Sequence, residues 1–260
     1  MKAIHYMLFA AATLTLAACS KEKEENPDKP VDEAAVGDYL MKDGTVLGQE
    51  NTLTPELASQ VVGIVFYAGH HENDASDYSA TGIGQQKCHG YAVALQNAIN
   101  DYCIWGLSGT ELGCCPTDGS GNKQDNLSIP DIDWSGYAWT QKIITAAGGK
   151  ENLNATEDAG YPATYYAVVD YENNKAQAPA NSSGWFLPSI GQMWNVYQNS
   201  TSLFDGKTGG LQMDRYYWSS SEDYDNPANR ALYALGQGLV NSSSKTESSN
   251  YRCVRPVLAF

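Results

Sequence analysis

The last third of the chain, residues 184–260, carries the signals that most constrain the fold. It opens on GWFLPSIGQMW, in which Ser189 stands three residues before Gln192. This is the capping-box spacing, in which the serine side chain accepts from the glutamine N–H and the glutamine side chain accepts from the serine N–H. The spacing predicts a helix over 189–199, and the aromatic residues before it predict a short buried strand at 185–187.

Three segments rich in aromatic and β-branched residues follow this helix. They cover 216–221, 229–235 and 252–260, and such residues favour strands. Pro256 lies inside the last segment, where it indicates an edge or a bulge because proline has no N–H for a ladder. The polar run NSSSKTESSNY at 241–251 is typical of a solvated surface loop.

The upstream half contains three further strand signals. In the segment 36–47, Asp43-Gly44 lies between two apolar pieces, a pattern typical of a short hairpin. VVGIVFY at 61–67 predicts a central buried strand. TYYAVVDY at 164–171 predicts another strand from its β-branched and aromatic residues.

Two upstream segments have helical spacing. In 88–102, apolar residues recur at intervals of four, three and four, which places them on one face of a helix. In 137–147 the same spacing ends at Gly148, a residue that commonly ends helices. The region 106–126 between them is rich in Gly, Asp and Asn, and its adjacent Cys114 and Cys115 suggest a long loop held by disulfides.

Residues 36–260 show no internal repeat and no shift of composition that would divide them. The mixture of strand and helix signals predicts one α+β domain.

The first eighteen residues resemble a secretory leader. Lys2 precedes an apolar run, and Leu16-Ala17-Ala18-Cys19 resembles the lipobox that lipoprotein signal peptidase cuts before a lipidated cysteine. We therefore expect a signal peptide over 1–18, a lipid on Cys19 and a charged flexible tether over 19–35. The acidic run behind the cysteine resembles the surface-export signal of Bacteroidota lipoproteins, so we expect an outer-membrane lipoprotein exposed at the cell surface.

The charge of the chain limits its partners. The formal net charge is −14, which opposes binding to a phosphate backbone or to an anionic bilayer. We expect no nucleic-acid partner, and contact with the membrane only through the lipid on Cys19.

Five cysteines remain beyond Cys19, and an exported chain meets an oxidising compartment in which pairing is favoured. An odd number leaves at least one thiol unpaired, and the sequence does not assign the pairs. The chain has no CxxC pair, and its His residues lie in polar surroundings, so we expect no metal site and no cofactor.

Four blocks of the sequence resemble a known family. GYAVALQNA, GWFLPSIGQMW, YYWSSSE and VRPVLAF are similar to blocks of the C-type lectin-like modules called DUF1566 or Fibrobacter succinogenes major paralogous domains. The resemblance implies a C-type lectin-like fold over 36–260, with two helices flanking a twisted antiparallel sheet and long loops on one side. The helices would be 88–102 and 189–199, and Trp185, Leu187, Trp218 and Val257 would be core residues.

A narrower resemblance covers 217–257. Variable proteins made by diversity-generating retroelements share this fold and have a WSSSE-like start, a polar middle and an RxVRPV-like end, which resemble 218–222 and 251–257 here. In this resemblance the polar residues between the two ends are the diversified ligand contacts. They are Asp223, Tyr224, Asp225, Asn226, Asn229, Arg230, Tyr233, Asn241, Ser242, Ser243, Lys245, Thr246 and Ser248.

These features favour a surface-anchored, adhesin-like lipoprotein that binds a protein or a glycan through its C-terminal loop face. Tyr supplies rigid contact area and Ser and Asn supply adaptable hydrogen bonds, as in antibody loops. An alternative is a tip or accessory subunit of a pilus, whose components would then be partners.

The sequence gives weaker support to two other functional classes, a calcium-dependent lectin and an enzyme. Asp225-Asn226-Pro227 is similar to the calcium loop of true C-type lectins, but the Trp-Asn-Asp partner motif is missing. An enzyme of the formylglycine-generating type resembles the chain around Cys253, but its Arg-Gly-Gly-Ser-Trp block is absent. We therefore expect no enzymatic activity.

Overall fold

We analysed a computed structural model of the chain. It describes residues 28–117, 129–207, 209–212, 214–235, 239–247 and 252–260. The predicted leader, the lipidation site Cys19 and residues 20–27 of the predicted tether lie outside the described residues. Residues 28–35 of that tether are described, and Asp28 and Lys29 pair there with Leu47 and Val46.

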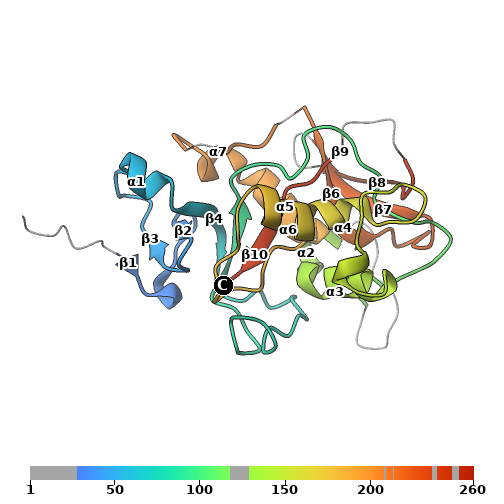
Figure 1. The fold of residues 1–260 in the computed structure, drawn as a ribbon, viewed down its shortest axis with the longest axis horizontal. Coiled ribbons are helices and arrows are strands. Elements are labelled where there is room, and N and C mark those ends of the chain that lie inside the picture. Colours follow the sequence, from blue (N-terminus) through green and yellow to red (C-terminus); the bar gives the residue numbers. More distant parts are fainter. Residues whose placement is uncertain (1–27, 118–128, 208, 213, 236–238, 248–251) are drawn as a thin grey trace, which may run out of the picture.

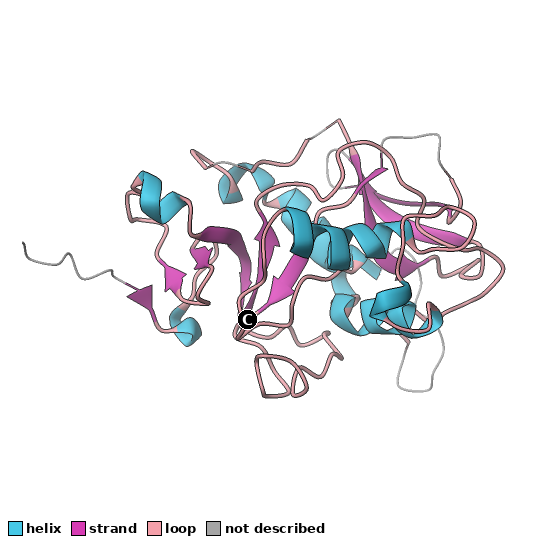
Figure 2. Ribbon diagram, in the orientation of Figure 1, coloured by secondary structure: helices cyan, strands magenta, loops and turns pink. Residues whose placement is uncertain are grey.

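The described chain forms an α+β structure with two separate sheets (Figure 1, Figure 2). The strands are β1 (Asp28–Lys29), β2 (Tyr39–Met41), β3 (Val46–Leu47), β4 (Val61–Ala68), β5 (Gly90–Ala94), β6 (Tyr216–Glu222), β7 (Arg230–Leu235), β8 (Leu239–Ser244), β9 (Arg252–Cys253) and β10 (Val257–Ala259). The α-helices are α1 (Pro55–Ala58), α2 (Ile129–Ile132), α3 (Gly136–Ala146), α4 (Pro162–Tyr165), α5 (Tyr171–Asn174), α6 (Ile190–Gln198) and α7 (Ser200–Leu203). Short 3-10 turns cover Val31–Glu33 and Lys150–Asn152, and a π-helical segment covers Tyr166–Asp170.

The N-terminal sheet has the order β1-β3-β2-β4-β5-β10, and its pairs are antiparallel. The predicted hairpin at 36–47 is confirmed as β2 and β3, and its turn residue Gly44 has a φ of 84° that favours glycine. The predicted central strand at 61–67 is confirmed as β4. Strand β10 closes this sheet on β5, so the end of the chain is built into the N-terminal sheet.

The C-terminal sheet has the order β8-β7-β6-β9. Its pairs are antiparallel except β6 and β9, which are parallel, with Tyr216 opposite Arg252. The predicted strands at 216–221 and 229–235 are confirmed as β6 and β7. The predicted strand at 252–260 divides at Arg255-Pro256, so that β9 belongs to one sheet and β10 to the other.

Helix α6 joins the two sheets in one core. Its start is confirmed as a capping box, because the Ser189 side chain accepts from Gln192 N and the Gln192 side chain accepts from Ser189 N. The buried face of α6 packs in one cluster with Ile64 of the N-terminal sheet and Leu232 of the C-terminal sheet. The predicted strand at 185–187 is reduced to an isolated bridge between Phe186 and Val257.

The helix predicted over 88–102 is wrong. Strand β5 occupies its first half, and all five β5 residues are buried between β4 and β10. A Cβ on Gly90 would lie 2.7 Å from the Phe260 ring, so glycine allows this close approach. A strand buried on both faces is apolar throughout, and its residues can match helical spacing by coincidence.

The strand predicted over 164–171 is also wrong, because the chain is helical from Pro162 to Asn174. Its buried residues include Ala163, Ala167 and Tyr171, which are four apart and lie on one helical face. Tertiary packing of this face outweighs the β-propensity of the segment. The helix predicted over 137–147 is confirmed as α3.

The long loop beginning at 106 is not held by disulfides in the described structure, since none of the five described cysteines forms a disulfide. A carboxylate holds its first part instead. Leu112 N and Cys114 N both donate to Glu222, at 2.9 Å each.

The loop predicted over 241–251 is corrected as well, because β8 extends to Ser244.

Candidate functional site

The predicted contact residues lie on the outer part of the C-terminal sheet and on the turn between β6 and β7. Figure 1 places this region at the opposite end of the molecule from β1. Ser248 lies outside the described residues.

The turn between β6 and β7 is built around Asp223. This residue is 4% exposed, and its Oδ1 accepts from Asp225 N at 2.8 Å and from Asn226 N at 3.0 Å. Its other oxygen lies 3.7 Å from Arg230 Nε. Asp223 therefore shapes the turn from inside rather than meeting a ligand.

Five of the predicted residues are exposed on this surface. They are Asp225, Asn226 and Asn229 in the turn, and Asn241 and Thr246 on or just after β8. Tyr224, Arg230 and Ser242 are partly buried beside them. We call these eight residues the β7–β8 surface.

Side chains satisfy both main-chain polar groups of Ser242 on β8. Ser242 N donates to Asn241 Oδ1 at 2.7 Å, and Arg230 Nη2 donates to Ser242 O at 2.6 Å. Arg230 Nε also donates to the Ser242 hydroxyl at 3.0 Å. The guanidinium of Arg230 is thus committed to the strand. Asn229 Nδ2 donates to Asn226 Oδ1 at 2.9 Å, so the side-chain NH2 groups of Asn226 and Asn241 remain without a partner among the described residues.

Besides Asp223, three predicted contact residues are buried, namely Tyr233, Ser243 and Lys245. Tyr233 is 8% exposed and lies on the face of the sheet that carries Trp218, with 5.8 Å between the two ring centroids. Lys245 is fully buried. Its Nζ donates to Glu222 at 2.6 Å and to Thr110 O at 3.0 Å. These residues build the sheet that supports the β7–β8 surface.

Sequence reasoning missed the packing of Arg252 against this inner face. The guanidinium lies 4.6 Å from the Tyr233 ring centroid and 4.9 Å from that of Trp218. Among the residues that the structure describes, its Nε and Nη1 have no hydrogen-bond partner, and the residue is 2% exposed. Stacking on aromatic rings is a mode of arginine packing that lysine does not reproduce.

A second buried carboxylate, Asp133, fixes β6 to α3. It accepts from Ser221 Oγ at 2.5 Å and from Trp139 Nε1 at 2.7 Å. Burial raises the pKa of Asp133 to about 6, although these two hydrogen bonds lower the pKa. Neither Asp133 nor Glu222 reaches the surface, so both act on the frame of the site.

The thiols have the properties of structural cysteines. Burial raises the pKa of Cys253 to about 11 and that of Cys88 to about 12, so the unreactive thiol form predominates at neutral pH. Cys88 Sγ lies 3.6 Å from His70 Nδ1. In the described part of the chain, no group of three or more His, Cys, Asp or Glu side chains is placed to hold a metal ion.

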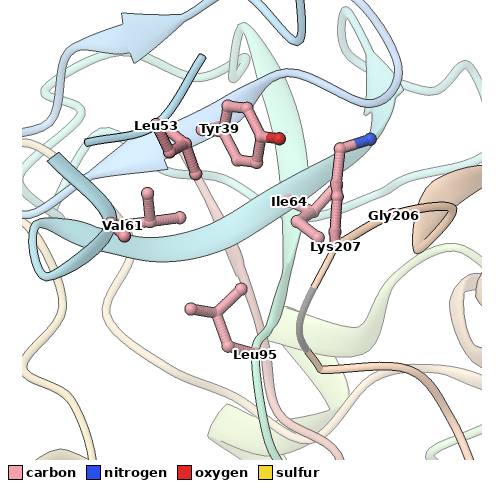
Figure 3. A pocket seen from close by; sticks show the side chains of 8 residues that line it. Tyr39, Leu53, Val61, Ile64, Leu95, Gly206 and Lys207 are labelled. Carbon is pink, nitrogen blue, oxygen red and sulfur yellow. The ribbon is translucent and has the colours of Figure 1, made fainter. Parts of the chain in front are cut away.

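An apolar pocket of about 300 Å³ lies on the N-terminal sheet and shares no residue with the β7–β8 surface. Tyr39, Val61 and Ile64 line it on the strands, Leu95 lies below them and Lys207 stands at its side (Figure 3). Lys207 Nζ donates to Leu203 O at 3.2 Å, so its ammonium is already partly used.

The helices that the structure describes are too short or too polar to cross a bilayer.

Comparison with known proteins gives a fold likeness alone. No family model matches the chain, and no curated protein matches it significantly. The crystal structure of a fimbrial protein from Bacteroides ovatus is similar in fold, with a TM-score of 0.60 and 17% sequence identity. The match covers 87% of this chain and 49% of the fimbrial protein, so the chain spans about half the length of that protein.

Proposed function

We propose that the chain is a cell-surface, pilus-associated binding module that contacts a protein or glycan ligand through its β7–β8 surface. The observation that carries the proposal is the separation of roles on the C-terminal sheet. Buried side chains such as Lys245 fix the frame, while the exposed Asn226 and Asn241 accept hydrogen bonds from their neighbours and have no partner for their side-chain NH2 groups among the described residues.

The position of the surface supports display. The described chain begins at β1, at the far end of the molecule from β7 and β8 (Figure 1). A lipid on Cys19, followed by the tether, would hold the module at the β1 end. The β7–β8 surface would then point away from the membrane of an outer-membrane lipoprotein.

The likeness to a fimbrial protein favours the pilus reading among the surface roles. At 17% sequence identity this likeness concerns the fold alone, and the role on a pilus is our proposal. A tip subunit would combine pilus partners with ligand binding. Immunogold labelling of purified pili tests this role, and labelling that stays on the cell body and never on pili would refute it.

We retain the C-type lectin-like assignment and the diversification of the surface as parts of the proposal. Of the thirteen residues that the resemblance to variable proteins indicates, five are exposed, so variation would concentrate at those positions. A reverse transcriptase gene and a near-identical template repeat beside the gene would support diversification, and their absence would remove it.

An array of glycans and surface ectoproteins tests the binding role. The combined variant Asn226→Ala, Asn241→Ala and Thr246→Ala should weaken binding to the strongest array ligand by about tenfold or more, equivalent to roughly 1.4 kcal/mol. Glu56→Gln on α1 is the control, since Glu56 is exposed at the other end of the molecule. Equal binding by the triple variant and the parent chain would exclude the β7–β8 surface.

A further inference from the structure

A groove that shares no residue with the β7–β8 surface is lined by four segments of the chain. It has a volume of about 410 Å³ and is bounded by the loop at 80–82, by α3 with Lys150 just after it, by Val168 and Glu172, and by the loop at 178–185. This volume is within the usual range for pockets that hold small ligands. We call it the α3 groove.

The walls of the α3 groove are fixed by main-chain contacts. Gly82 N donates to Ser182 O at 3.0 Å, and a Cβ on Gly82 would lie 1.8 Å from Ala180 O. Only glycine fits this contact between the two loops. Trp185 Nε1 donates to Ala176 O at 2.7 Å, which fixes the end of the loop at 178–185 to the segment just after α5. The groove is therefore formed before any ligand arrives.

Tyr137 gives the groove an aromatic wall. Its ring meets Phe186 edge-on, with 5.8 Å between centroids, and lies 5.1 Å from the Tyr78 ring. The residue is half-buried, and within the described part of the chain its hydroxyl has no hydrogen-bond partner. Ile144 and Val168 add aliphatic surface.

Three further polar groups of the groove keep free capacity. The Glu172 carboxylate accepts only Ala178 N, at 3.1 and 3.3 Å, among the described residues. The side-chain amide of Gln141 and the ammonium of Lys150 are exposed, with no partner in that same part of the chain. The groove thus offers a carboxylate, an amide, a phenol and an ammonium beside an aromatic ring.

This combination matches a saccharide better than other small ligands. A sugar ring has an apolar C–H face that packs on an aromatic ring, and hydroxyls at its edge that bond to carboxylates and amides. A phosphate-bearing ligand would meet one ammonium beside an opposing carboxylate, in a chain of net charge −14. A purely apolar ligand would leave Glu172 and Gln141 desolvated without partners.

We propose that the α3 groove is a metal-independent saccharide site, with Tyr137 as the stacking platform and Glu172 and Gln141 as hydroxyl-binding groups. The site is independent of the β7–β8 surface and goes beyond the function proposed above. The chain would then carry two recognition sites on different elements.

A printed array of neutral hexose and N-acetylhexosamine oligosaccharides, read in the presence of EDTA, is the test. Gln141→Ala and Glu172→Gln should each weaken binding to the strongest oligosaccharide by about tenfold, or roughly 1.4 kcal/mol. Both side chains lie at the groove surface, so neither substitution should disturb the fold. Unchanged thermal unfolding of the variants would show that the fold is intact. Tyr137→Phe, which keeps the ring, should bind more strongly than Tyr137→Leu.

Two controls separate this proposal from the first. Glu56→Gln and the triple variant at Asn226, Asn241 and Thr246 should leave oligosaccharide binding unchanged. Binding lost only in the triple variant would move the saccharide to the β7–β8 surface and overturn the α3 groove proposal. An array without any bound oligosaccharide would overturn it too, as would binding that EDTA abolishes.

Discussion

The ammonium of Lys245 lies 2.6 Å from the Glu222 carboxylate, and both side chains are fully buried. Glu222 also accepts the N–H groups of Leu112 and Cys114. Lys245 lies over the Trp105 ring, 4.7 Å from its centroid. The pair therefore ties the end of β8 to β6 and to the loop before α2.

Removing one partner should destabilise the chain strongly. Lys245→Ala leaves the Glu222 carboxylate buried without its cation, which should lower the free energy of unfolding by about 3–5 kcal/mol. Lys245→Met combined with Glu222→Gln should cost less than Lys245→Ala, since neither buried charge remains. Urea denaturation measures both. A small effect of Lys245→Ala together with a loss of ligand binding would return Lys245 to the contact surface.

Asp133 should make stability depend on pH. Its folded pKa of about 6 lies above the ordinary value of 3.8, so its contribution is complete below about pH 4 and is lost as pH rises through 6. Across that window the parent chain should lose roughly 3 kcal/mol relative to Asp133→Asn, at about 1.4 kcal/mol per pKa unit. Urea unfolding from pH 4 to 7 gives this difference, and a difference that stays constant with pH would contradict it.

His71 should give the stability a pH dependence of the opposite sign. Its ring stacks on Trp134 with 3.9 Å between centroids, and burial lowers its pKa below 6.5 in spite of Glu72 and Asp74 nearby. The folded state favours the neutral ring, so stability should fall as pH drops below 6.5. His71→Phe keeps the stacked ring and should unfold with less acid sensitivity between pH 7 and 5. Identical thermal-melting profiles for the two chains would rule out this contribution.

The capping box of α6 should carry measurable stability. Ser189→Ala removes the acceptor for Gln192 N and also the hydrogen bond from Ser189 Oγ to Asp133 O, at 2.7 Å. Loss of a serine cap costs about 0.5–2 kcal/mol, and this buried position should lie at the upper end. Ser202→Ala on α7, where the hydroxyl is exposed, is the matched control. Equal urea midpoints for the two variants would show that the cap adds nothing.

Local signals predicted the parts of the fold that local chemistry decides. The capping box at Ser189, the turn at Asp43-Gly44 and the glycine after α3 each depend on a few neighbouring residues, and all three appear in the structure. The α+β class followed from the same signals.

The errors arose where distant contacts decide the structure. Residues 90–94 are a strand because β4 and β10 pair with them from both sides, and β10 comes from the far end of the chain. Residues 162–174 are helical because one face of that segment packs in the core. Neither partner is visible in the local spacing.

The sequence predicted which segment carries the candidate site, but it did not predict which residues of that segment are exposed. Composition located the polar region between β6 and the end of the chain, but it gave Lys245 and Asn241 equal weight. The register of β8 against β7 and the buried carboxylate of Glu222 determine that Lys245 turns inward. The α3 groove left no sequence signal, because its lining residues come from four separate segments.

The bonding of Ser242 bears on how closely copies of this protein can be crowded together. β8 is the outermost strand of its sheet, and a bare outer strand is a template on which another chain can extend the sheet. Asn241 and Arg230 already occupy the main-chain groups of Ser242 in the middle of that strand. The main-chain groups of Ser242 are therefore closed to pairing with a second chain, which lowers the tendency of crowded copies to join through this edge.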